Sequence, residues 1–465
     1  VCAPAAARPA IEAEKAGIPS VVITTTGFSV LARLTGKSGG VESLNVAEYP
    51  GPLGIHDVNT MSKNIESTLL DKIVDGLTLD SAESAASAPA ANARATVFTG
   101  SADEIQQYFD EREWSDGLPV VPPTAERIEA FLRFTDRAPD EVIAVLQSAN
   151  LQATPWNIAA NGVMAGCRPE HMPLLIAAVE ALGEEKCSLN NIGSSSALVP
   201  FVLFNGPIVD QLGIKAGGQL ASRLPNAVIG RAIGLIIRNI AGFRPGSTYM
   251  GTFGYPLAFA LAEDTGHADG SPWEPFHVEQ GFDRGTSTVT VGITSNWGSS
   301  PAPYDRPEQD GASITLKMLS QEILKKTRIY NFPGSGPHAD TVMLTVMLSP
   351  PVARTLAAAG YSKQQVKEYL CEHTRMSLRE FDWLSRYTSI SGVMARERVA
   401  EGVFPPAFAG SPDDIIKVLS GPDIISIIVC GDPYRNRLMV MEGGHTKPTT
   451  KIIQLPRDWN HLQRR

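Results

Sequence analysis

Residues 157–182 read Asn157-Ile-Ala-Ala-Asn-Gly-Val-Met-Ala-Gly-Cys-Arg-Pro-Glu-His-Met-Pro-Leu-Leu-Ile-Ala-Ala-Val-Glu-Ala-Leu182, and this stretch decides how the centre of the chain folds. Its first half is small and apolar, which is typical of a helix that packs closely. Gly166 ends that helix, and Pro169 and Pro173 lack a backbone N–H, so a second regular helix is expected only from about His171. The buried stripe of this second helix is predicted to be Leu175, Ala178, Val179 and Leu182.

Cys167 and Arg168 occupy the break between these two helices. A helix N-terminus and a neighbouring guanidinium both favour the thiolate form of cysteine. The pattern therefore predicts a catalytic thiol at Cys167, with Arg168 stabilising developing negative charge. The alternative is a small buried cysteine that fills space between helices, as free cysteines commonly do. Asn161, on the first helix, is a candidate for substrate binding.

Composition bounds the class of protein. The chain has 465 residues, 43% hydrophobic and 19% charged, which is typical of a soluble globular protein with two or three domains. A net charge of −9 argues against nucleic acid or an anionic membrane as the main partner. No apolar run reaches the ~20 residues that span a bilayer. Five scattered cysteines without a Cys-x-x-Cys pair indicate a reducing cytoplasm and no zinc ribbon.

The first 79 residues alternate between helices and strands. Helices are predicted at 3–17 and near 61–76, and strands at 18–24 and 44–49. This rhythm predicts an α/β fold that starts with an incomplete doubly wound parallel-sheet unit, followed by a larger α/β (or α+β) region. Because the unit begins with a helix, we expect another chain or a missing N-terminal segment to supply the preceding strand.

In such sheets, ligands bind at the carboxyl ends of the strands. This rule would bring Cys2, Thr25, Thr26 and His56 to one crevice, with Cys2 as the second candidate for a catalytic thiol. The alternative for His56 is an exposed loop histidine.

The run from Cys2 to Phe28 resembles the second half of the UGSC family, most specifically at Glu14-Lys-Ala-Gly-Ile-Pro-Ser-Val21. The resemblance covers roughly residues 1–80. These proteins are selenoprotein-related thiol proteins akin to the substrate-binding B subunits of glycine and betaine reductases. The resemblance implies a Rossmann-like segment and thiol redox chemistry. The family's defining selenocysteine or cysteine lies upstream of the matching stretch, so Cys2 is the only thiol in this neighbourhood.

Residues 80–102 are rich in Ala and Ser and are predicted to be a linker. An α/β domain with the Cys167 motif is predicted at 103–330, and a C-terminal α/β subdomain at 331–465. Ser115-Asp-Gly-Leu-Pro-Val-Val-Pro-Pro-Thr124, together with Val163–Glu170, resembles a bacterial domain often joined to or encoded near UGSC-type proteins. Trp114 and Asp116 are each either a ligand contact or a loop anchor.

Two polar loops supply further candidates for substrate binding. One is the loop after Cys187, whose amides, hydroxyls and backbone N–H groups suit a carboxylate or phosphate, unless it is an ordinary polar loop. The other is a long Gly-rich, aromatic loop at 242–256, a type that is commonly functional. The candidates in these loops are Asn190, Asn191, Ser194, Ser195, Tyr249 and Thr252.

A metal site is the weaker alternative. Its ligands would be Glu263, His267, His277 and Glu279, although their spacing fits no zinc signature.

The last third repeats the α/β rhythm. A helix is predicted at 312–327 and a strand at 341–348. Capping patterns at Ser362, Ser377 and Ser411 predict three helix starts, and a buried strand is predicted to end at Cys430.

These observations favour an enzyme that acts on a small polar or anionic molecule by thiol-based chemistry, redox or nucleophilic. One alternative is a metal-assisted lyase or hydrolase that uses the histidines and glutamates at 263–279. Another is a non-catalytic subunit that binds substrate or scaffolds a larger complex. The sequence identifies no cofactor. We expect a cytoplasmic protein that forms an oligomer or a complex.

Overall fold

The computed structural model describes residues 3–51, 56–78, 94–147, 149–194, 197–254, 258–264, 270–295, 298–304, 306, 309–326, 343–388, 395–402, 404–443 and 448–463. The chain divides into two compact units. Unit 1 comprises residues 1–199, 228–259 and 453–465, and unit 2 comprises residues 200–227 and 260–452. The fold class is the mixed α/β arrangement that the sequence predicts, with a small parallel sheet followed by larger sheets with helices.

The first 79 residues of unit 1 form a small parallel-sheet element. In chain order it contains α1 (Ala3–Lys15), β1 (Val22–Thr25), α2 (Ser29–Ser38), β2 (Val46–Tyr49), α3 (Val58–Asn64), a π-helical turn (Ile65–Leu69) and α4 (Leu70–Thr78). Strands β1 and β2 are parallel, with Val22 opposite Val46 and Thr25 opposite Tyr49. A small core of Ala47, Tyr49 and Leu69 joins β2 to the last helices.

The remainder of unit 1 is mostly helical. It contains α5 (Ala102–Glu111), α6 (Ala125–Leu132), β3 (Ala144–Leu146), β4 (Leu151–Ala153), α7 (Pro155–Ala165), α8 (Met172–Leu182), α10 (Asn226–Asn239) and α17 (Trp459–Leu462), with 3₁₀ turns at Pro169–His171, Glu185–Cys187 and Leu189–Gly193. Strands β3 and β4 form an antiparallel pair. Helix α7 ends at Gly166 in the left-handed conformation (φ +84°), and α8 begins at Met172, which confirms the predicted break.

Unit 2 is built on two four-stranded sheets with the orders β14-β7-β5-β6 and β12-β9-β13-β8. Its strands are β5 (Val199–Asn205), β6 (Phe259–Ala262), β7 (Thr288–Thr294), β8 (Ser299–Pro301), β9 (Leu344–Leu348), β10 (Arg375–Ser377), β11 (Ile415–Lys417), β12 (Ile425–Val429), β13 (Arg437–Glu442) and β14 (Thr449–Ile452). Its helices are α9 (Ile208–Gln211), α11 (Phe276–Glu279), α12 (Gly311–Lys326), α13 (Pro350–Ala358), α14 (Lys363–His373), α15 (Leu378–Thr388) and α16 (Ala395–Ala400). Short 3₁₀ turns lie at Leu220–Ser222, Pro406–Ala409 and Pro422–Ile424.

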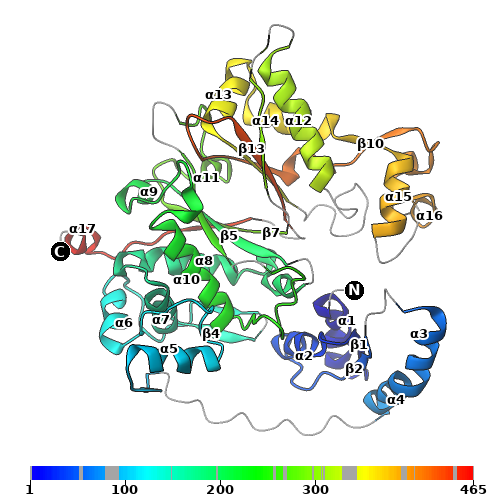
Figure 1. Ribbon diagram of the computed structural model, residues 1–465, viewed down its shortest axis with the longest axis horizontal. Coiled ribbons are helices and arrows are strands. Elements are labelled where there is room, and N and C mark those ends of the chain that lie inside the picture. The colour runs from blue at the N-terminus through cyan, green and yellow to red at the C-terminus, as the bar shows by residue number, and fades with distance from the viewer. Residues whose placement is uncertain are drawn as a thin grey trace. The chain divides into compact units, whose positions relative to one another are not determined.

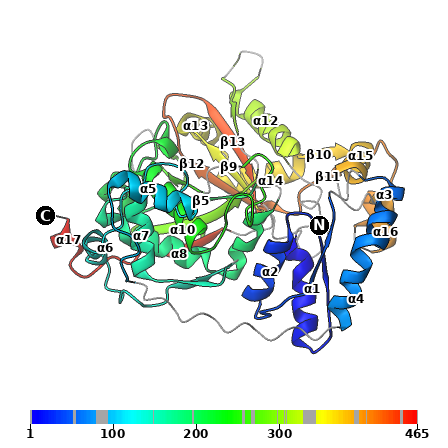
Figure 2. The ribbon, with the colours of Figure 1, turned by 60° about the horizontal axis from the view of Figure 1, so that its bottom comes forward.

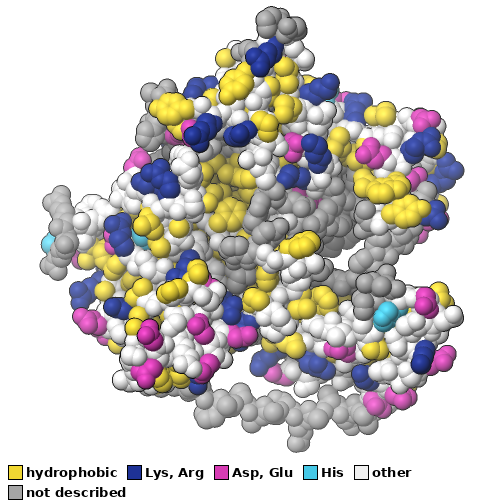
Figure 3. Space-filling view, in the orientation of Figure 1, with side chains coloured by type: hydrophobic (Ala, Val, Ile, Leu, Met, Phe, Trp, Pro, Cys, Tyr) yellow, Lys and Arg dark blue, Asp and Glu magenta, His cyan; other side chains and the backbone are white. Residues whose placement is uncertain are grey.

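Helices α12, α13 and α14 lie around the second of these sheets (Figures 1 and 2). Strands β9 and β12 are parallel, whereas β13 runs antiparallel to β9. The core of this part is fully buried on β9 and β12 and on one side of α12, for example at Leu316, Val346 and Ile427. Hydrophobic side chains also gather on the outside of α15 (Figure 3), where Trp383 and Tyr387 are 58% and 66% exposed.

Most of the predicted elements are confirmed. The capping box at Ser362 is present at the start of α14. The helix expected after Ser411 is wrong, because the carboxylate of Asp414 accepts a hydrogen bond from the backbone N–H of Ser411 in a turn, and the next residues form the short strand β11. None of the described helices is long and apolar enough to cross a membrane.

Candidate functional site

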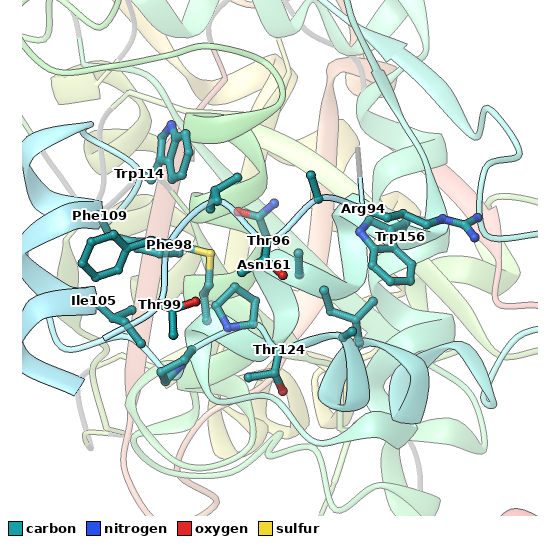
Figure 4. A pocket seen from close by; sticks show the side chains of 18 of the residues that line it. Arg94, Thr96, Phe98, Thr99, Ile105, Phe109, Trp114, Thr124, Trp156 and Asn161 are labelled. Atoms are coloured by element: carbon teal, nitrogen blue, oxygen red, sulfur yellow. The ribbon is translucent and has the colours of Figure 1, made fainter. Parts of the chain in front are cut away.

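A cavity of about 660 Å³ lies inside unit 1 (Figure 4). Its walls come from residues 94–100, from α5, α6 and α7, from the extended segment around Trp114 and Pro122, and from the last residue of α10. Volumes of this size are typical of small-molecule sites. Most of the lining side chains are apolar or aromatic, and the polar ones are threonines and asparagines apart from Arg94.

Helix α7 presents one stripe to the cavity. Trp156, Ala160 and Met164 recur every four residues, and Asn161 lies beside them. The helix is fixed at its start by Thr154, whose hydroxyl accepts a hydrogen bond from the backbone N–H of Asn157, with proline at the first helical position. The stripe is therefore held by a helix with a well-defined N-terminus.

The outer wall is a strap, residues 94–100, that has no regular secondary structure. None of its residues makes a backbone–backbone hydrogen bond with another described residue. Arg94 holds one end, pairing with Asp140 (Nη2 to Oδ1, 2.6 Å) and lying over the ring of Trp156. The ring of Phe98 stacks on Tyr108 at 4.5 Å between centroids. Among the described residues, side-chain contacts therefore hold the strap over the cavity, and the strap continues directly into the capped start of α5 at Ser101.

Two asparagine amides form the polar part of the inner wall. Nδ2 of Asn239 donates to Oδ1 of Asn161 (2.8 Å) and to the carbonyl of Trp114 (2.9 Å). Nδ2 of Asn161 donates to the carbonyl of Asn157 (2.8 Å). These partners fix both amide orientations, because a flipped Asn239 would place its oxygen against two acceptors. Oδ1 of Asn239 is buried and has no donor among the described residues.

Helix α10 holds the segment that carries Trp114. Arg231 makes two hydrogen bonds to the carboxylate of Asp116 (2.9 and 2.8 Å), and Nε of Arg238 donates to the carbonyl of Glu113 (2.6 Å). Burial raises the pKa of Asp116, but Arg231 outweighs it and leaves that pKa below its usual value. Asp116 therefore anchors this loop through Arg231, and Arg238 holds the same segment at Glu113.

Cys167 is buried beside α10 and does not line the cavity. Its Sγ donates to the carbonyl of Val228 (3.3 Å), and burial raises the pKa of the thiol far above its usual value despite the nearby charge of Arg231. Arg168 points its guanidinium to Glu170 (3.1 Å) and is 60% exposed. Burial therefore opposes the thiolate expected here and outweighs the nearby charge of Arg231, and a reactive thiol at Cys167 stays a prediction.

His171 closes the turn that follows Cys167. The ring is buried, its Nδ1 accepts a hydrogen bond from the backbone N–H of Arg168 (3.2 Å), and its Nε2 has no partner among the described residues. Burial, with a smaller contribution from Arg168, lowers the pKa of His171 to about 4. The imidazole is therefore neutral at physiological pH.

The carboxyl ends of β1 and β2 bring two further expected residues together. The hydroxyl of Thr26 accepts a hydrogen bond from the backbone N–H of Gly51 (2.9 Å). The half-buried ring of His56 lies against the same glycine, and its Nδ1 is 2.7 Å from the hydroxyl of Tyr49. Thr25 is opposite Tyr49 in the sheet. Cys2, expected at this edge, lies outside the described residues.

The two polar loops lie next to each other. The backbone N–H of Met250 donates to the carbonyl of Gly193 (3.3 Å), and a side chain at Gly193 would meet the carbonyl of Thr248 at 2.5 Å. This contact brings the loop of Asn191 and Ser194 close to the loop of Tyr249 and Thr252, and none of these four residues lines the cavity. The side chain of Asn190 and all of Ser195 fall outside the described residues. Tyr249 is buried and not presented to solvent.

In unit 2, the expected metal ligands Glu263 and Glu279 contact lysines instead. We call Asn205, Glu263, Glu279, Lys363 and Lys367 the Glu263 cluster. Lys363 Nζ lies 3.5 Å from Glu263 and 2.6 Å from Glu279, and Lys367 Nζ lies 2.7 Å from Glu279. Nδ2 of Asn205 donates to Glu263 at 2.7 Å.

Backbone N–H groups complete the shell of Glu263: Phe276 N donates at 2.6 Å and Val429 N at 3.3 Å. His277 is buried, its Nε2 lies 3.3 Å from the carbonyl of Arg284, and burial lowers its pKa. Within the described part of the chain, no group of three or more His, Cys, Asp or Glu side chains is arranged to hold a metal ion. His267 lies outside that part. Glu263 and Glu279 thus have lysine ammonium groups and, for Glu263, backbone N–H groups as partners at the place where the metal-site hypothesis expected an ion.

Comparison with known proteins adds one finding. The UGSC family model matches residues 1–79. This segment belongs to the UGSC family. The resemblance noted from the sequence is therefore confirmed for the UGSC domain, which contains β1, β2 and helices α1 to α4. No curated protein matches the chain, and the cavity lies in residues that no family model covers.

Among the residues that line the cavity, sequence reasoning named Asn161 as a binding residue and Trp114 as either a ligand contact or a loop anchor. The missed side chains include Trp156 and Asn239. The four-residue spacing of Trp156, Ala160 and Met164 was visible, but the same spacing marks an ordinary buried helix face. The strap was missed because its residues fall in the predicted linker.

Proposed function

We propose that this protein binds a small organic molecule in the cavity of unit 1, which is the substrate-binding alternative of the sequence analysis. The observation that carries the proposal is the lining itself: aromatic and aliphatic walls surround a pair of asparagine amides whose orientations are fixed. Apolar walls with a few well-placed polar groups are the usual chemistry of ligand sites.

Thiol chemistry receives less support. Cys167 is buried, its pKa is raised, and it hydrogen-bonds a backbone carbonyl. A nucleophilic cysteine needs thiolate character and access to substrate. Thiol chemistry at Cys2 remains a prediction, because that residue lies outside the described part of the chain.

The proposal is tested with a variant that fills the cavity. Ala160 lines it from the middle of α7, so Ala160→Trp places an indole in the ligand space. A small-molecule fragment collection is screened against the wild-type protein by ligand-observed NMR, and the binders are then measured with the variant. We expect at least one binder whose signal is lost with Ala160→Trp.

Ala400→Trp is the matched control, because Ala400 is exposed on α16 in unit 2. It should retain every binder. Unfolding midpoints of both variants show whether each is folded. Binders that remain unaffected by Ala160→Trp in a folded protein, or a screen without binders, would refute the proposed site.

A further inference from the structure

We infer that the strap, residues 94–100, is the gate of the cavity: it opens to admit a ligand and closes over it. The inference rests on the proposed function and specifies how its ligand enters and leaves. Three observations carry it. The strap is more exposed than the walls that face it, weak contacts hold it closed, and it ends at a fixed hinge.

The strap differs from the other walls in how deeply it is buried. Every residue from 94 to 100 is exposed, and Phe98 is 37% exposed although it lines the cavity. The facing walls belong to the core, where Phe109, Ile128 and Met164 are at most 5% exposed. Moving α5, α6 or α7 would bring such side chains into water, and the cost rises with the apolar area exposed. The strap therefore moves at a lower cost than these helices.

Hydrogen bonding shows the same contrast. The strap makes no backbone–backbone hydrogen bond with another described residue. Helices α5, α6 and α7 have their helical hydrogen bonds, and the segment of Trp114 is bonded through its carbonyls to Arg238 and Asn239. Exposed segments with few backbone hydrogen bonds are those that open locally at low free energy.

Among the described residues, the strap is held closed at Arg94 and at Phe98, which lie at opposite ends of the cavity (Figure 4). Arg94 makes an exposed ion pair with Asp140 (2.6 Å) and lies over the ring of Trp156 at 5.0 Å. Phe98 stacks on Tyr108 at 4.5 Å. Exposed ion pairs contribute little, and an aromatic stack shifts an equilibrium by about two- to tenfold. Contacts of this strength favour the closed strap and still let it open often.

The strap has a fixed hinge at its C-terminal end. It continues into α5, whose first turn is held by a capping box. The backbone N–H of Ser101 donates to the carboxylate of Glu104 (2.7 Å), and the backbone N–H of Glu104 donates to the hydroxyl of Ser101 (3.4 Å). Gly100 directly precedes this box, and a β-carbon there would meet the ring of Phe98 at 2.8 Å. Because glycine accepts a wide range of backbone angles, rotation at Gly100 swings the strap and leaves the helix in place.

A covalent lock tests the gate. Arg94→Cys and Asp140→Cys are combined in a background with Cys2→Ser and Cys371→Ser, and a short bis-maleimide joins the two new thiols across the closed strap. The probe is N-phenyl-1-naphthylamine, an uncharged dye that fluoresces in apolar surroundings, and stopped-flow fluorescence gives its rates of binding and release. We expect both rates to fall at least about tenfold in the locked protein, because opening then limits exchange. The dissociation constant should change less than about threefold, because a gate alters rates and not the equilibrium.

The same double variant before cross-linking is the matched control, and Asp140→Cys alone carries the reagent away from the cavity lining. Both should exchange the dye at least as fast as the background. Ala160→Trp should abolish binding of the dye, which shows that the dye occupies the cavity. If the double variant does not fold, hydrogen exchange of the wild type decides. The backbone amides of residues 95–100 should exchange at least about fivefold more slowly with the dye bound than without it.

Two outcomes would overturn the gate and leave the proposed function standing, provided that Ala160→Trp still displaces the dye. One is unchanged exchange of the dye in the locked protein, and the other is unchanged hydrogen exchange of residues 95–100. If the dye does not enter the cavity, the same rates are measured with a fragment that Ala160→Trp displaces. If neither the dye nor any fragment responds to Ala160→Trp, the proposed function itself fails, and the gate with it.

Discussion

The cavity of unit 1 and the Glu263 cluster of unit 2 both bury polar side chains, but they differ in charge. Glu263 is fully buried and receives four donors, from Asn205, Phe276, Val429 and Lys363. The described lining of the cavity, by contrast, consists of neutral amides, hydroxyls and apolar or aromatic side chains, and its one charged residue, Arg94, pairs with Asp140. Each region also holds one amide oxygen without a donor among the described residues, Oδ1 of Asn205 in the cluster and Oδ1 of Asn239 in the lining. The comparison shows that the chain itself supplies the partners of its buried charge in the Glu263 cluster, whereas an unpartnered amide oxygen occurs in both regions and does not by itself distinguish a ligand site.

The largest expected effect is a loss of stability when the buried ion pair of Lys363 and Glu263 is broken. Lys363→Met leaves the fully buried Glu263 without its cation, and loss of one partner of a buried ion pair costs about 3–5 kcal/mol. Lys367→Met is the matched control, because Lys367 contacts only Glu279 of the cluster's two carboxylates. Its cost should be about 1 kcal/mol. Denaturant unfolding measures both. Equal costs would contradict the central position given to Glu263.

The next effect concerns pH and unit 1. The pKa of His171 is about 4 in the folded protein, below its ordinary value of 6.5. Between these two values the unfolded chain binds a proton that the folded protein does not, so stability is complete above pH 6.5 and falls as the pH drops towards 4. The loss reaches about 3 kcal/mol at most, since each pKa unit corresponds to about 1.4 kcal/mol.

Unfolding of the wild type and of His171→Gln, measured from pH 7 to pH 4, isolates this contribution. Glutamine does not titrate, so the variant should lose less stability over that interval. Identical pH dependence in the two proteins would mean that His171 titrates normally and is not sealed in the turn.

A smaller effect distinguishes packing from chemistry at Cys167. Removing one buried sulfur in Cys167→Ala should cost about 1 kcal/mol and leave binding by the cavity unchanged, because Cys167 does not line it. In a background with Cys2→Ser, Cys371, which is only partly buried, should be alkylated at neutral pH faster than Cys167. Mass spectrometry of the labelled peptides gives the order, and preferential labelling of Cys167 would restore the thiol hypothesis.

The smallest effect lies at the end of the strap. Arg94 and Asp140 are 49% and 82% exposed, so their pairing contributes less than about 1 kcal/mol. Arg94→Ala should hardly change the unfolding midpoint, yet it should speed exchange of a bound fragment, because it removes the pairing with Asp140 and the contact with Trp156 at one end of the strap. Asp140→Asn should act in the same way. A large loss of stability would show that the strap belongs to the core.

The sequence predicted much of the local structure. Gly166, Pro169 and Pro173 located the break between α7 and α8, and Ser362 located the start of α14, because caps and prolines act through near neighbours. It could not show that Lys363 would meet Glu263 a hundred residues away, or that Cys167 would be enclosed by α10. These contacts depend on tertiary packing, and the spacing of residues along the sequence does not reveal them.

The strap also bears on how genes of this kind can be rearranged. Residues 94–100 fall within the Ala/Ser-rich stretch where a recombination event would seem harmless, yet they form one wall of the cavity. A crossover before residue 94 exchanges the UGSC domain and leaves every described wall of the cavity in place. A crossover a few residues later replaces part of the strap, and so one wall of the cavity, with residues from another gene. The position of the crossover between the UGSC domain and the residues that follow it would then decide whether the cavity keeps its wall, and with it any ligand preference, or receives a new one.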